Sequence, residues 1–286
     1  MISIKIIREK PQSVQDILAL KGYEGSISKI HSMDENYRTI NKKLEGFRAR
    51  KNKVSEQVAI SKRDGTDSND QIVEMRKLGE DIKQLESELN RAKKKLNTKL
   101  DEIPNLPHSS VPKGKDEKDN VIIREWGSKK VFDFTEKTHL ELSKDLGLID
   151  LERGAKISGS GFPIYTGKGA KLERSLINSM IDHHTEQYGF IEIFPSVLIS
   201  EQSMRTTGQL PKFKEDMYLS DLDNLYLAPT AEVPITNMHR QEIIPESELP
   251  INYVAYSPCF RRESGSYGKD TRGLLGLHQF NKVEMV

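Results

Sequence analysis

Residues 260–286 read FRRESGSYGKDTRGLLGLHQFNKVEMV, and this stretch decides the fold of the second half of the chain. It predicts a strand, a Gly-rich cationic loop and a returning strand. Because residues two apart on a strand share a face, Arg261 and Glu263 should point together, as should Phe280 and Glu284. Such a hairpin would offer a cation for a phosphate, an aromatic plane for a base, and carboxylates for an amine or a hydroxyl. From spacing alone, a solvated strand face explains alternating Arg and Glu more often, so both interpretations stay open at this point.

Two segments upstream are expected to extend the same sheet. APTAEVP, residues 228–234, should add a third strand on which Thr230 and Glu232 share a face. GFIEIFPSVLI, residues 189–199, reads as a strand with Pro195 inside it, which suits a sheet edge or a strand end. These runs do not alternate regularly with helices, so a mostly antiparallel sheet is expected. The helix predicted at 171–184 carries an apolar face made of Leu172, Leu176, Ile177 and Met180.

The first hundred residues are expected to form a long helical hairpin. Apolar residues recur three and four apart in two runs, and the polar loop DGTDSND at 64–70 separates them. The seam residues are Ile30, Met33, Tyr37, Ile40, Leu44, Phe47, Val54 and Val58, followed by Ile72, Met75, Leu78, Ile82, Leu85, Leu89, Ala92 and Leu96. Lys51 occupies the one seam position that lacks an apolar residue. Two heptad helices joined by a short loop should fold back as an antiparallel coiled coil whose arms reach about 45 Å.

Prolines end this hairpin. Pro104, Pro107 and Pro112 prevent a helix from continuing, and the charged residues among and after them have little apolar surface to bury. The expected segments are a first domain over 1–105, a linker over 106–120 and a second domain over 121–286. The single Trp126 is expected to lie in a core.

Composition narrows the class of function. A net charge of +1 gives no global attraction to nucleic acid, so any basic patch must be local. Cys259, the single cysteine, excludes a disulfide framework and a cysteine-based zinc cluster, and is expected to be a small buried apolar residue in a reducing compartment. No apolar run is long enough to span a membrane, so a cytoplasmic protein without membrane contact is expected. GFPIYTGKG at 161–169 fails as a P-loop, because its glycines are too far apart and Gly169 replaces the Ser or Thr that binds magnesium.

A resemblance to a known family favours the interpretation of the 260–286 hairpin as a ligand site over its interpretation as a solvated strand face. PCFRRESGSYGKDTRGLLGLHQFNKVEMV resembles the second signature motif of class II aminoacyl-tRNA synthetases, in the version carried by the seryl-tRNA synthetase family. IPNLPHSSVPKGKDEKDN, HLELSKDLGLIDLERGAKISGSGFPIYTGKGAKLERSLI and LAPTAEVPI resemble that family in the same order, and MISIKIIREKPQSV resembles its N-terminus. The resemblance covers the whole chain. It implies an α+β fold in which an N-terminal antiparallel coiled-coil hairpin binds tRNA and an antiparallel sheet with helices carries catalysis.

The implied activity is that of a serine–tRNA ligase. Serine and ATP would form seryl-adenylate, and the seryl group would pass to tRNA(Ser) and also to tRNA(Sec). Pro195 matches the proline of the family's first motif at a dimer interface, which implies a homodimer.

The resemblance also implies roles for individual residues. Arg261 and Glu263 would be catalytic, and the ATP contacts would be Arg261, Arg262, Glu263, Leu277 and Phe280. The serine contacts would be Thr230, Ala231, Glu232 and Glu284. The tRNA contacts would be Arg48, Arg50 and Lys53 on the hairpin, with Lys269 and Arg272 in the Gly-rich loop.

The sequence departs from the family pattern in two ways. Gly276 stands where the family usually has an Arg close to the triphosphate. The third motif and the Mg²⁺ ligands are expected beyond Val286, so the catalytic sheet would be incomplete at the C-terminus. None of the residues named above is expected to bind a metal, and the 286-residue chain alone is expected to be inactive in pyrophosphate exchange.

These departures keep alternatives open. One is a non-catalytic, synthetase-like fragment that binds tRNA. Another is a synthetase-like ligase acting on carrier proteins, which is disfavoured because such relatives lack the long hairpin and use zinc.

Overall fold

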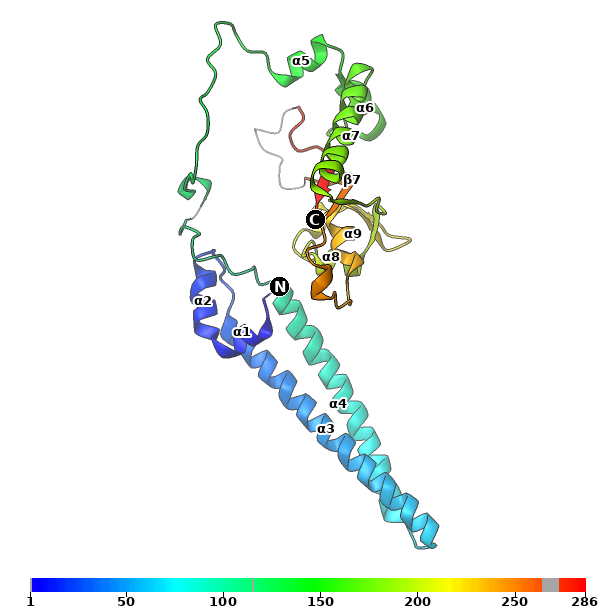
Figure 1. Cartoon of the computed structure of the whole chain (residues 1–286). Coiled ribbons are helices and arrows are strands. Elements are labelled where there is room, and N and C mark those ends of the chain that lie inside the picture. Colours follow the sequence, from blue (N-terminus) through cyan, green and yellow to red (C-terminus); the bar gives the residue numbers. More distant parts are fainter. Residues whose placement is uncertain (1, 115, 264–272) are drawn as a thin grey trace. The chain divides into compact units, whose positions relative to one another are not determined.

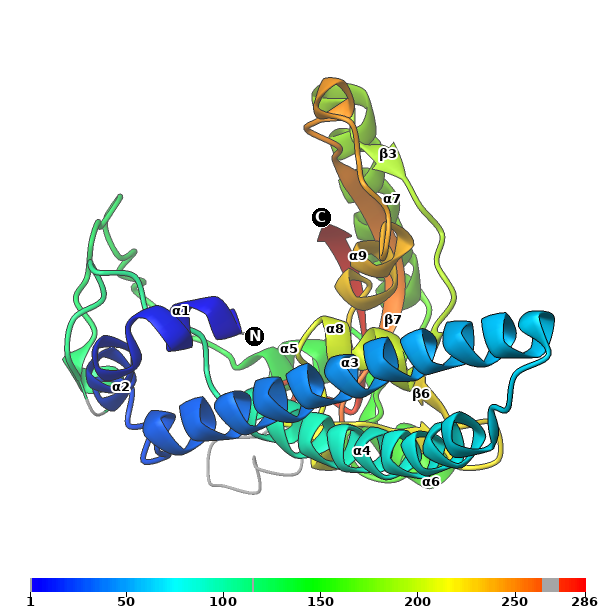
Figure 2. The same cartoon turned by 90° about the horizontal axis from the view of Figure 1, so that it is seen from below.

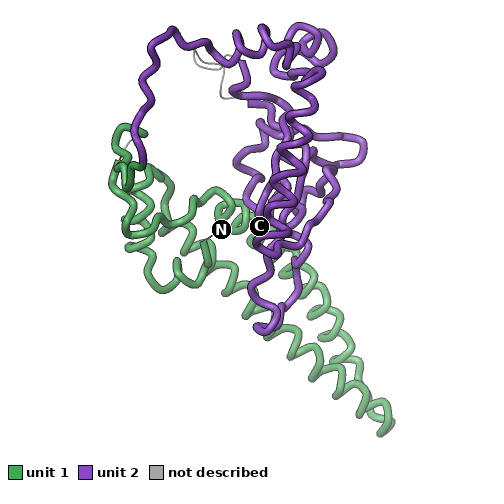
Figure 3. The backbone as a smooth tube through the Cα atoms, turned by 45° about the horizontal axis from the view of Figure 1, so that its top comes forward, with its two compact units in different colours: residues 1–126 green, residues 127–286 purple. Residues whose placement is uncertain are grey.

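The computed structural model describes residues 2–114, 116–263 and 273–286, and the chain folds as two compact units (Figures 1 and 3). The first unit is Met1–Trp126 and the second is Gly127–Val286. No helix in these described ranges is long and apolar enough to cross a membrane.

The first unit is dominated by the predicted hairpin, which is confirmed. Its described elements are α1 (Ile4–Glu9), α2 (Pro11–Ala19), α3 (Ile27–Asp64), α4 (Asn69–Asp101) and a 3-10 turn at Glu117–Asp119. α3 and α4 run antiparallel, side by side, along their length (Figures 1 and 2). The Ser26 hydroxyl caps the start of α3 by accepting from the Lys29 amide at 3.3 Å. α3 ends at Asp64, and the capping residue that follows, Gly65, has a φ of 67°, a left-handed conformation that glycine adopts without steric cost.

Three apolar clusters occupy successive parts of the hairpin seam. The cluster at its base packs α1 and α2 against α3 and α4 through Ile7, Val14, Leu18, Ile27, Ile30, Leu96 and Leu100. The middle cluster is Leu44, Ile82 and Leu85. The third cluster, nearest the turn, is Val54, Val58 and Leu78. Lys51 is accommodated in the seam opposite a residue without a side chain, because a Cβ added to Gly79 would lie 3.9 Å from Lys51 Nζ.

A buried carboxylate ties α1 to α3 at the base. Asp34 is 1% exposed, and its two oxygens accept from Arg8 Nε and Nη2 at 2.7 and 2.6 Å. Arg38 Nε donates to the same carboxylate at 2.8 Å. The Arg8 hydrogen bond holds the pKa of Asp34 below its usual range. The carboxylate is therefore ionised at neutral pH and anchors the short N-terminal helix.

The second unit combines short strands with helices. Its described helices are α5 (His139–Asp145), α6 (Leu151–Ser158), α7 (Lys168–Tyr188), α8 (Glu201–Thr206) and α9 (Glu232–Met238), with 3-10 turns at Lys214–Asp216 and Glu246–Glu248. Its described strands are β1 (Ile149–Asp150), β2 (Ile164–Tyr165), β3 (Ile191–Glu192), β4 (Leu198–Ser200), β5 (Leu219–Ser220), β6 (Leu225–Leu227), β7 (Tyr253–Phe260) and β8 (Gln279–Met285).

These strands form three small sheets, in the orders β1-β2, β3-β7-β8 and β4-β6-β5. The described pairings are antiparallel except β3 with β7, which is parallel. The α+β class and the mainly antiparallel pairing are therefore confirmed. α7 lies along β7 and β8 (Figure 2), and Asn281 Nδ2 of β8 donates to Glu173 Oε1 of α7 at 3.1 Å.

Two expectations for the chain beyond the hairpin are wrong, and one is only half right. Residues 189–199 do not form one strand: β3 and β4 belong to different sheets, and Pro195 lies in the segment between them. Trp126 is 90% exposed and lies in no core of the structure. The predicted helix at 171–184 exists within α7, but its apolar face is open, since Leu172, Leu176 and Met180 are 53, 46 and 47% exposed.

Candidate active site

The β7–β8 pair sets the spacing of the candidate site. The register pairs Cys259 with Phe280, Ser257 with Lys282 and Ala255 with Glu284. Phe280, Lys282 and Glu284 are therefore two residues apart on one face of β8, as the sequence predicts. The intervening Asn281 points to α7, so the site occupies the other face of the sheet.

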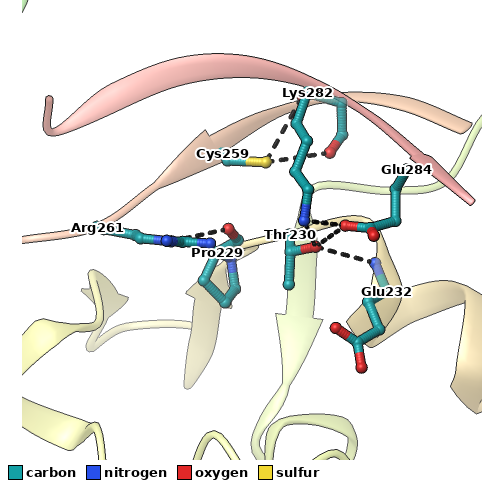
Figure 4. A network of polar contacts seen from close by, with 8 residues as sticks. Pro229, Thr230, Glu232, Cys259, Arg261, Lys282 and Glu284 are labelled. Atoms are coloured by element: carbon teal, nitrogen blue, oxygen red, sulfur yellow. Dashed lines mark hydrogen bonds and ion pairs between the residues drawn. The ribbon is translucent and has the colours of Figure 1, made fainter. Parts of the chain in front are cut away.

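Thr230 and Glu284 form the polar centre of this face (Figure 4). Thr230 Oγ1 donates to Glu284 Oε2 at 2.6 Å, and Lys282 Nζ donates to Thr230 Oγ1 at 3.2 Å and pairs with the same Glu284 oxygen. Thr230 is 4% exposed, and the Glu284 side chain is 17% exposed. The residues are 54 positions apart in the chain, and the fold brings them into direct contact.

The strand expected over 228–234 is wrong. β6 ends at Leu227, a turn follows, and α9 begins at Glu232. The Glu232 amide donates to Thr230 Oγ1 at 3.3 Å, while its exposed carboxylate points away from Thr230 (Figure 4). Thr230 and Glu232 therefore do not share a face. Ala231 is fully buried against Ile235 and cannot offer its side chain to a ligand.

Arg261 and Phe280 form a second group beside Thr230. The Arg261 guanidinium carbon lies 5.1 Å from the centroid of the Phe280 ring, within the range of a cation–π contact. Arg261 Nε also donates to the Pro229 carbonyl oxygen at 3.3 Å (Figure 4). Pro229, the residue next to Thr230, thus holds the Arg261 guanidinium. This contact places the cation and the aromatic ring beside the Thr230–Glu284 pair.

The prediction that Arg261 and Glu263 share one face of a strand is wrong. β7 ends at Phe260, and Glu263 has a φ of 50°, which no strand adopts. The Arg262 guanidinium lies 5.3 Å from the centroid of the Tyr218 ring. Arg262 is therefore directed to Tyr218, and half-buried Glu263 does not share an extended strand with Arg261.

The remaining sequence-predicted residues belong to other elements or fall outside the described residues. Arg48 and Arg50 form ion pairs across the hairpin, with Glu86 and Glu74 respectively, and Lys53 is exposed on α3. Leu277 is 8% exposed and lies two residues before the first residue of β8. Lys269 and Arg272 fall outside the described residues. Gly276, which stands where the family usually has an Arg, has a φ of 68°, a conformation in which an Arg would be strained.

The sequence interpretation gave no role to Lys282, although its spacing from Phe280 and Glu284 places it on the same face. Cys259, on the neighbouring strand, is fully buried, and burial raises the pKa of its thiol. It therefore stays protonated and packs as the small apolar residue that was expected.

The site thus combines a guanidinium over an aromatic ring with a shielded carboxylate, hydroxyl and ammonium. The guanidinium suits a phosphate, the ring suits a base, and the Thr230–Glu284 pair suits an amine or a hydroxyl. The ranges 2–114, 116–263 and 273–286 contain no group of three or more His, Cys, Asp or Glu residues that could hold a metal ion.

Comparisons with known proteins agree with this combination. The seryl-tRNA synthetase N-terminal domain model matches residues 1–107, and the tRNA synthetase class II core domain model (G, H, P, S and T) matches residues 213–286. The serine–tRNA ligase of Methylacidiphilum infernorum is 49% identical over 288 residues, which cover 100% of the chain and 68% of that relative.

The chain belongs to the seryl-tRNA synthetase family. The resemblance found in the sequence is therefore confirmed. A second member of the family, the serine–tRNA ligase of Thermodesulfovibrio yellowstonii, is 47% identical over 289 residues, and the chain again covers 68% of its length.

Solved structures of the family share the fold. The seryl-tRNA synthetase from Pyrococcus horikoshii complexed with ATP matches with a TM-score of 0.86 and 33% identity, covering 100% of this chain and 69% of that one. The cytoplasmic serine–tRNA ligase from Naegleria fowleri in complex with AMP matches with a TM-score of 0.77 and 25% identity, covering 100% of this chain and 70% of that one. Both of these family members are bound to an adenine nucleotide, ATP in the first and AMP in the second.

Proposed function

We propose that this member of the seryl-tRNA synthetase family activates serine with ATP and transfers it to tRNA(Ser), and also to tRNA(Sec). The observation that carries the proposal is the direct contact of Thr230 with Glu284, beside Arg261 lying over Phe280. A serine, its adenylate and an adenine base need these chemical groups next to one another.

The first step joins serine to AMP. A serine carboxylate oxygen attacks the α-phosphorus of ATP, and the bond to the bridging oxygen breaks as pyrophosphate leaves. Arg261 neutralises the charge that gathers on the phosphate, and Phe280 positions the adenine ring by stacking. Among the other nucleotide contacts we include Arg262, Glu263 and the backbone at Leu277.

The second step passes the seryl group to RNA. A ribose hydroxyl of the terminal tRNA adenosine attacks the seryl carbonyl carbon, and AMP leaves with the electron pair of the broken bond. Neither step forms a covalent bond to the protein, so the contribution of the site is positioning and charge neutralisation. Mg²⁺ bound together with ATP would add to the neutralisation of phosphate charge.

Serine would be held by Thr230, Glu284 and the segment through Ala231 and Glu232. The shielded carboxylate can accept hydrogen bonds from the amino group and the hydroxyl of serine. Alanine lacks the hydroxyl, so it would leave polar groups of the site unpaired, which is a strong basis for rejection.

The tRNA contacts that we propose are local basic groups, in line with the near-zero net charge of the chain. Arg48, Arg50 and Lys53 are on the exposed surface of α3, where a coiled coil presents phosphate-binding cations over a long distance. Lys269 and Arg272 are proposed to approach the acceptor end. The domain assignment that goes with this is a tRNA-binding domain over 1–105, a linker over 106–120 and a catalytic domain over 121–286.

A homodimer is part of the proposal. The open apolar face of α7 and Phe194, which is 83% exposed beside Pro195, support self-association, because exposed apolar patches of this kind are commonly covered by a partner. Sedimentation equilibrium should give twice the chain mass, and Leu176→Asp should shift it to the monomer. A wild-type monomer at all concentrations would contradict the proposed homodimer.

We place the protein in the cytoplasm, where its tRNA and ATP substrates are found.

The test of the function is serine-dependent ATP–pyrophosphate exchange by the protein expressed from its complete reading frame, followed by charging of tRNA(Ser). We expect exchange with L-serine and none without an amino acid. Exchange with no amino acid preference, or with a different amino acid, would contradict the proposal. Binding of tRNA(Ser) without any exchange would instead support a non-catalytic tRNA-binding protein.

A further inference from the structure

The ammonium group of Lys282 lies at the Thr230–Glu284 pair (Figure 4). It donates to Thr230 Oγ1 at 3.2 Å and forms an ion pair with Glu284 Oε2. The Lys282 and Glu284 side chains are 34 and 17% exposed, so the contact is partly shielded from water. The site that should receive an amino acid therefore already contains an ammonium group from the protein itself.

The hydrogen bonds of Thr230 leave no place for a further donor on its hydroxyl while this ammonium is bound. A hydroxyl has one proton and two lone pairs. Thr230 Oγ1 donates its proton to Glu284 at 2.6 Å, and accepts from the Glu232 amide at 3.3 Å and from Lys282 at 3.2 Å. A new donor can reach Oγ1 only by replacing one of these partners. The Glu232 amide is fixed at the start of α9, whereas Lys282 has a flexible four-carbon stem.

We propose that the Lys282 ammonium occupies the position of the serine ammonium in the free site and is displaced when serine binds. This inference rests on the proposed function. Two ammonium groups cannot share Glu284 Oε2 without strong repulsion, so the lysine charge must leave as the serine charge enters. The second oxygen of Glu284 can accept the serine hydroxyl.

The displaced ammonium of Lys282 can pair with the carboxylate of the substrate. Lys282 lies between Phe280 and Glu284 on one face of β8, so its stem is anchored between the nucleotide side and the amino acid side of the site. The serine carboxylate and the α-phosphate of ATP would meet in this interval. Lys282 thus exchanges one carboxylate for another: it leaves Glu284 and pairs with the carboxylate of the substrate.

Two analogues of serine separate the two roles of Lys282, as a competitor of the ligand's ammonium and as a partner of the ligand's carboxylate. Serinol has the ammonium and hydroxyl groups of serine but no carboxylate, and 3-hydroxypropanoate has the carboxylate and hydroxyl but no ammonium. If Lys282 occupies the subsite in about nine molecules of ten, it weakens the binding of serinol about tenfold. It should strengthen the binding of 3-hydroxypropanoate, which needs a cation and does not compete for Glu284.

The experiment measures the dissociation constants of serine, serinol and 3-hydroxypropanoate by calorimetry for the wild type, Lys282→Met and the control Lys171→Met, whose lysine is exposed on α7. Lys282→Met should bind serinol about tenfold more tightly and 3-hydroxypropanoate several-fold more weakly. Serine should change less than either, because the gain and the loss offset each other. The control should change none of the three constants.

A measurement on the wild type keeps the test independent of how well the variant folds. Acetylation of Lys282 by acetic anhydride, followed by mass spectrometry, should speed up several-fold when serinol saturates the site, because serinol releases the ammonium. Acetylation of Lys171 should not change.

Two results would overturn the inference: equal or weaker serinol binding by Lys282→Met, or unchanged Lys282 acetylation in the presence of serinol. If the wild type binds serine normally and either result is obtained, only the displacement of Lys282 is wrong. If the wild type binds neither serine nor serinol, the proposed function fails as well.

Discussion

The hairpin and the second unit are held together in different ways. In the hairpin, two helices joined by a four-residue turn bury one apolar seam against each other, and each cluster draws on neighbouring turns of both helices. The candidate site instead depends on contacts across 32 positions between Pro229 and Arg261 and across 54 positions between Thr230 and Glu284. The second unit also leaves large apolar side chains open, such as Leu222 at 99% and Ile243 at 96% exposure. The hairpin should therefore fold as an independent unit, whereas the site should be sensitive to changes at distant points of its own unit.

A cavity in the hairpin seam should have the largest effect and should leave the site intact. Leu44 is 1% exposed within the middle cluster, so Leu44→Ala should lower the free energy of unfolding of the hairpin by about 2–5 kcal/mol. Urea denaturation followed by circular dichroism measures this, and Val73→Ala, at a side chain 68% exposed, is the control. ATP affinity should not change. A parallel loss of ATP binding would show that the two units do not act independently.

The next effect concerns the cation of the site. Arg261→Ala should slow adenylate formation by about 100- to 1,000-fold, because the guanidinium meets charge that develops in the transition state. Single-turnover pyrophosphate release measures the rate in the protein from the complete reading frame. Arg153→Ala removes an arginine whose side chain is 79% exposed, and should have no effect. A rate for Arg261→Ala within a few-fold of the wild type would assign the charge neutralisation to another group.

The aromatic ring should matter for binding more than for rate. Phe280→Ala should weaken ATP binding by about 1–3 kcal/mol through the loss of stacking, and should leave serine binding unchanged. Equilibrium dialysis with labelled ATP gives the constant, and Phe194→Ala, at a side chain 83% exposed, is the control. Unchanged ATP affinity would mean that the base does not stack on this face of β8.

The hairpin surface should give the smallest change. Each phosphate contact contributes about 0.7–0.9 to the slope of log K for tRNA binding against log salt concentration. Replacing Arg48, Arg50 and Lys53 by Gln should reduce this slope by less than three such contributions, because two of the three cations already pair with glutamates. The matched variant Glu74→Gln with Glu86→Gln frees those two arginines and should steepen the slope. Equal slopes in all three proteins would place the tRNA elsewhere.

The two regions also differ in how far the sequence predicts them. The heptads predict the hairpin because its contacts repeat at a fixed spacing, and even Lys51 stands at a recognisable position. The spacing on β8 likewise predicts that Phe280 and Glu284 share a face. The shape of the 228–234 segment could not be predicted, because the turn at Thr230 and the start of α9 depend on the contact with Glu284 across the unit. The same holds for Arg262, whose direction depends on Tyr218.

The recognition of serine is the central claim, and the binding of serine compared with alanine tests it most directly. Calorimetry with each amino acid, in the wild type and in Glu284→Gln, gives four dissociation constants. The site described here predicts that the wild type binds alanine at least about 100-fold more weakly than serine, since a hydroxyl partner would be left unpaired. Glu284→Gln should lose most of this preference while ATP binding stays intact. Equal affinity of the wild type for serine and alanine, or a full preference for serine without the Glu284 carboxylate, would contradict the assignment of Thr230 and Glu284 as the serine site.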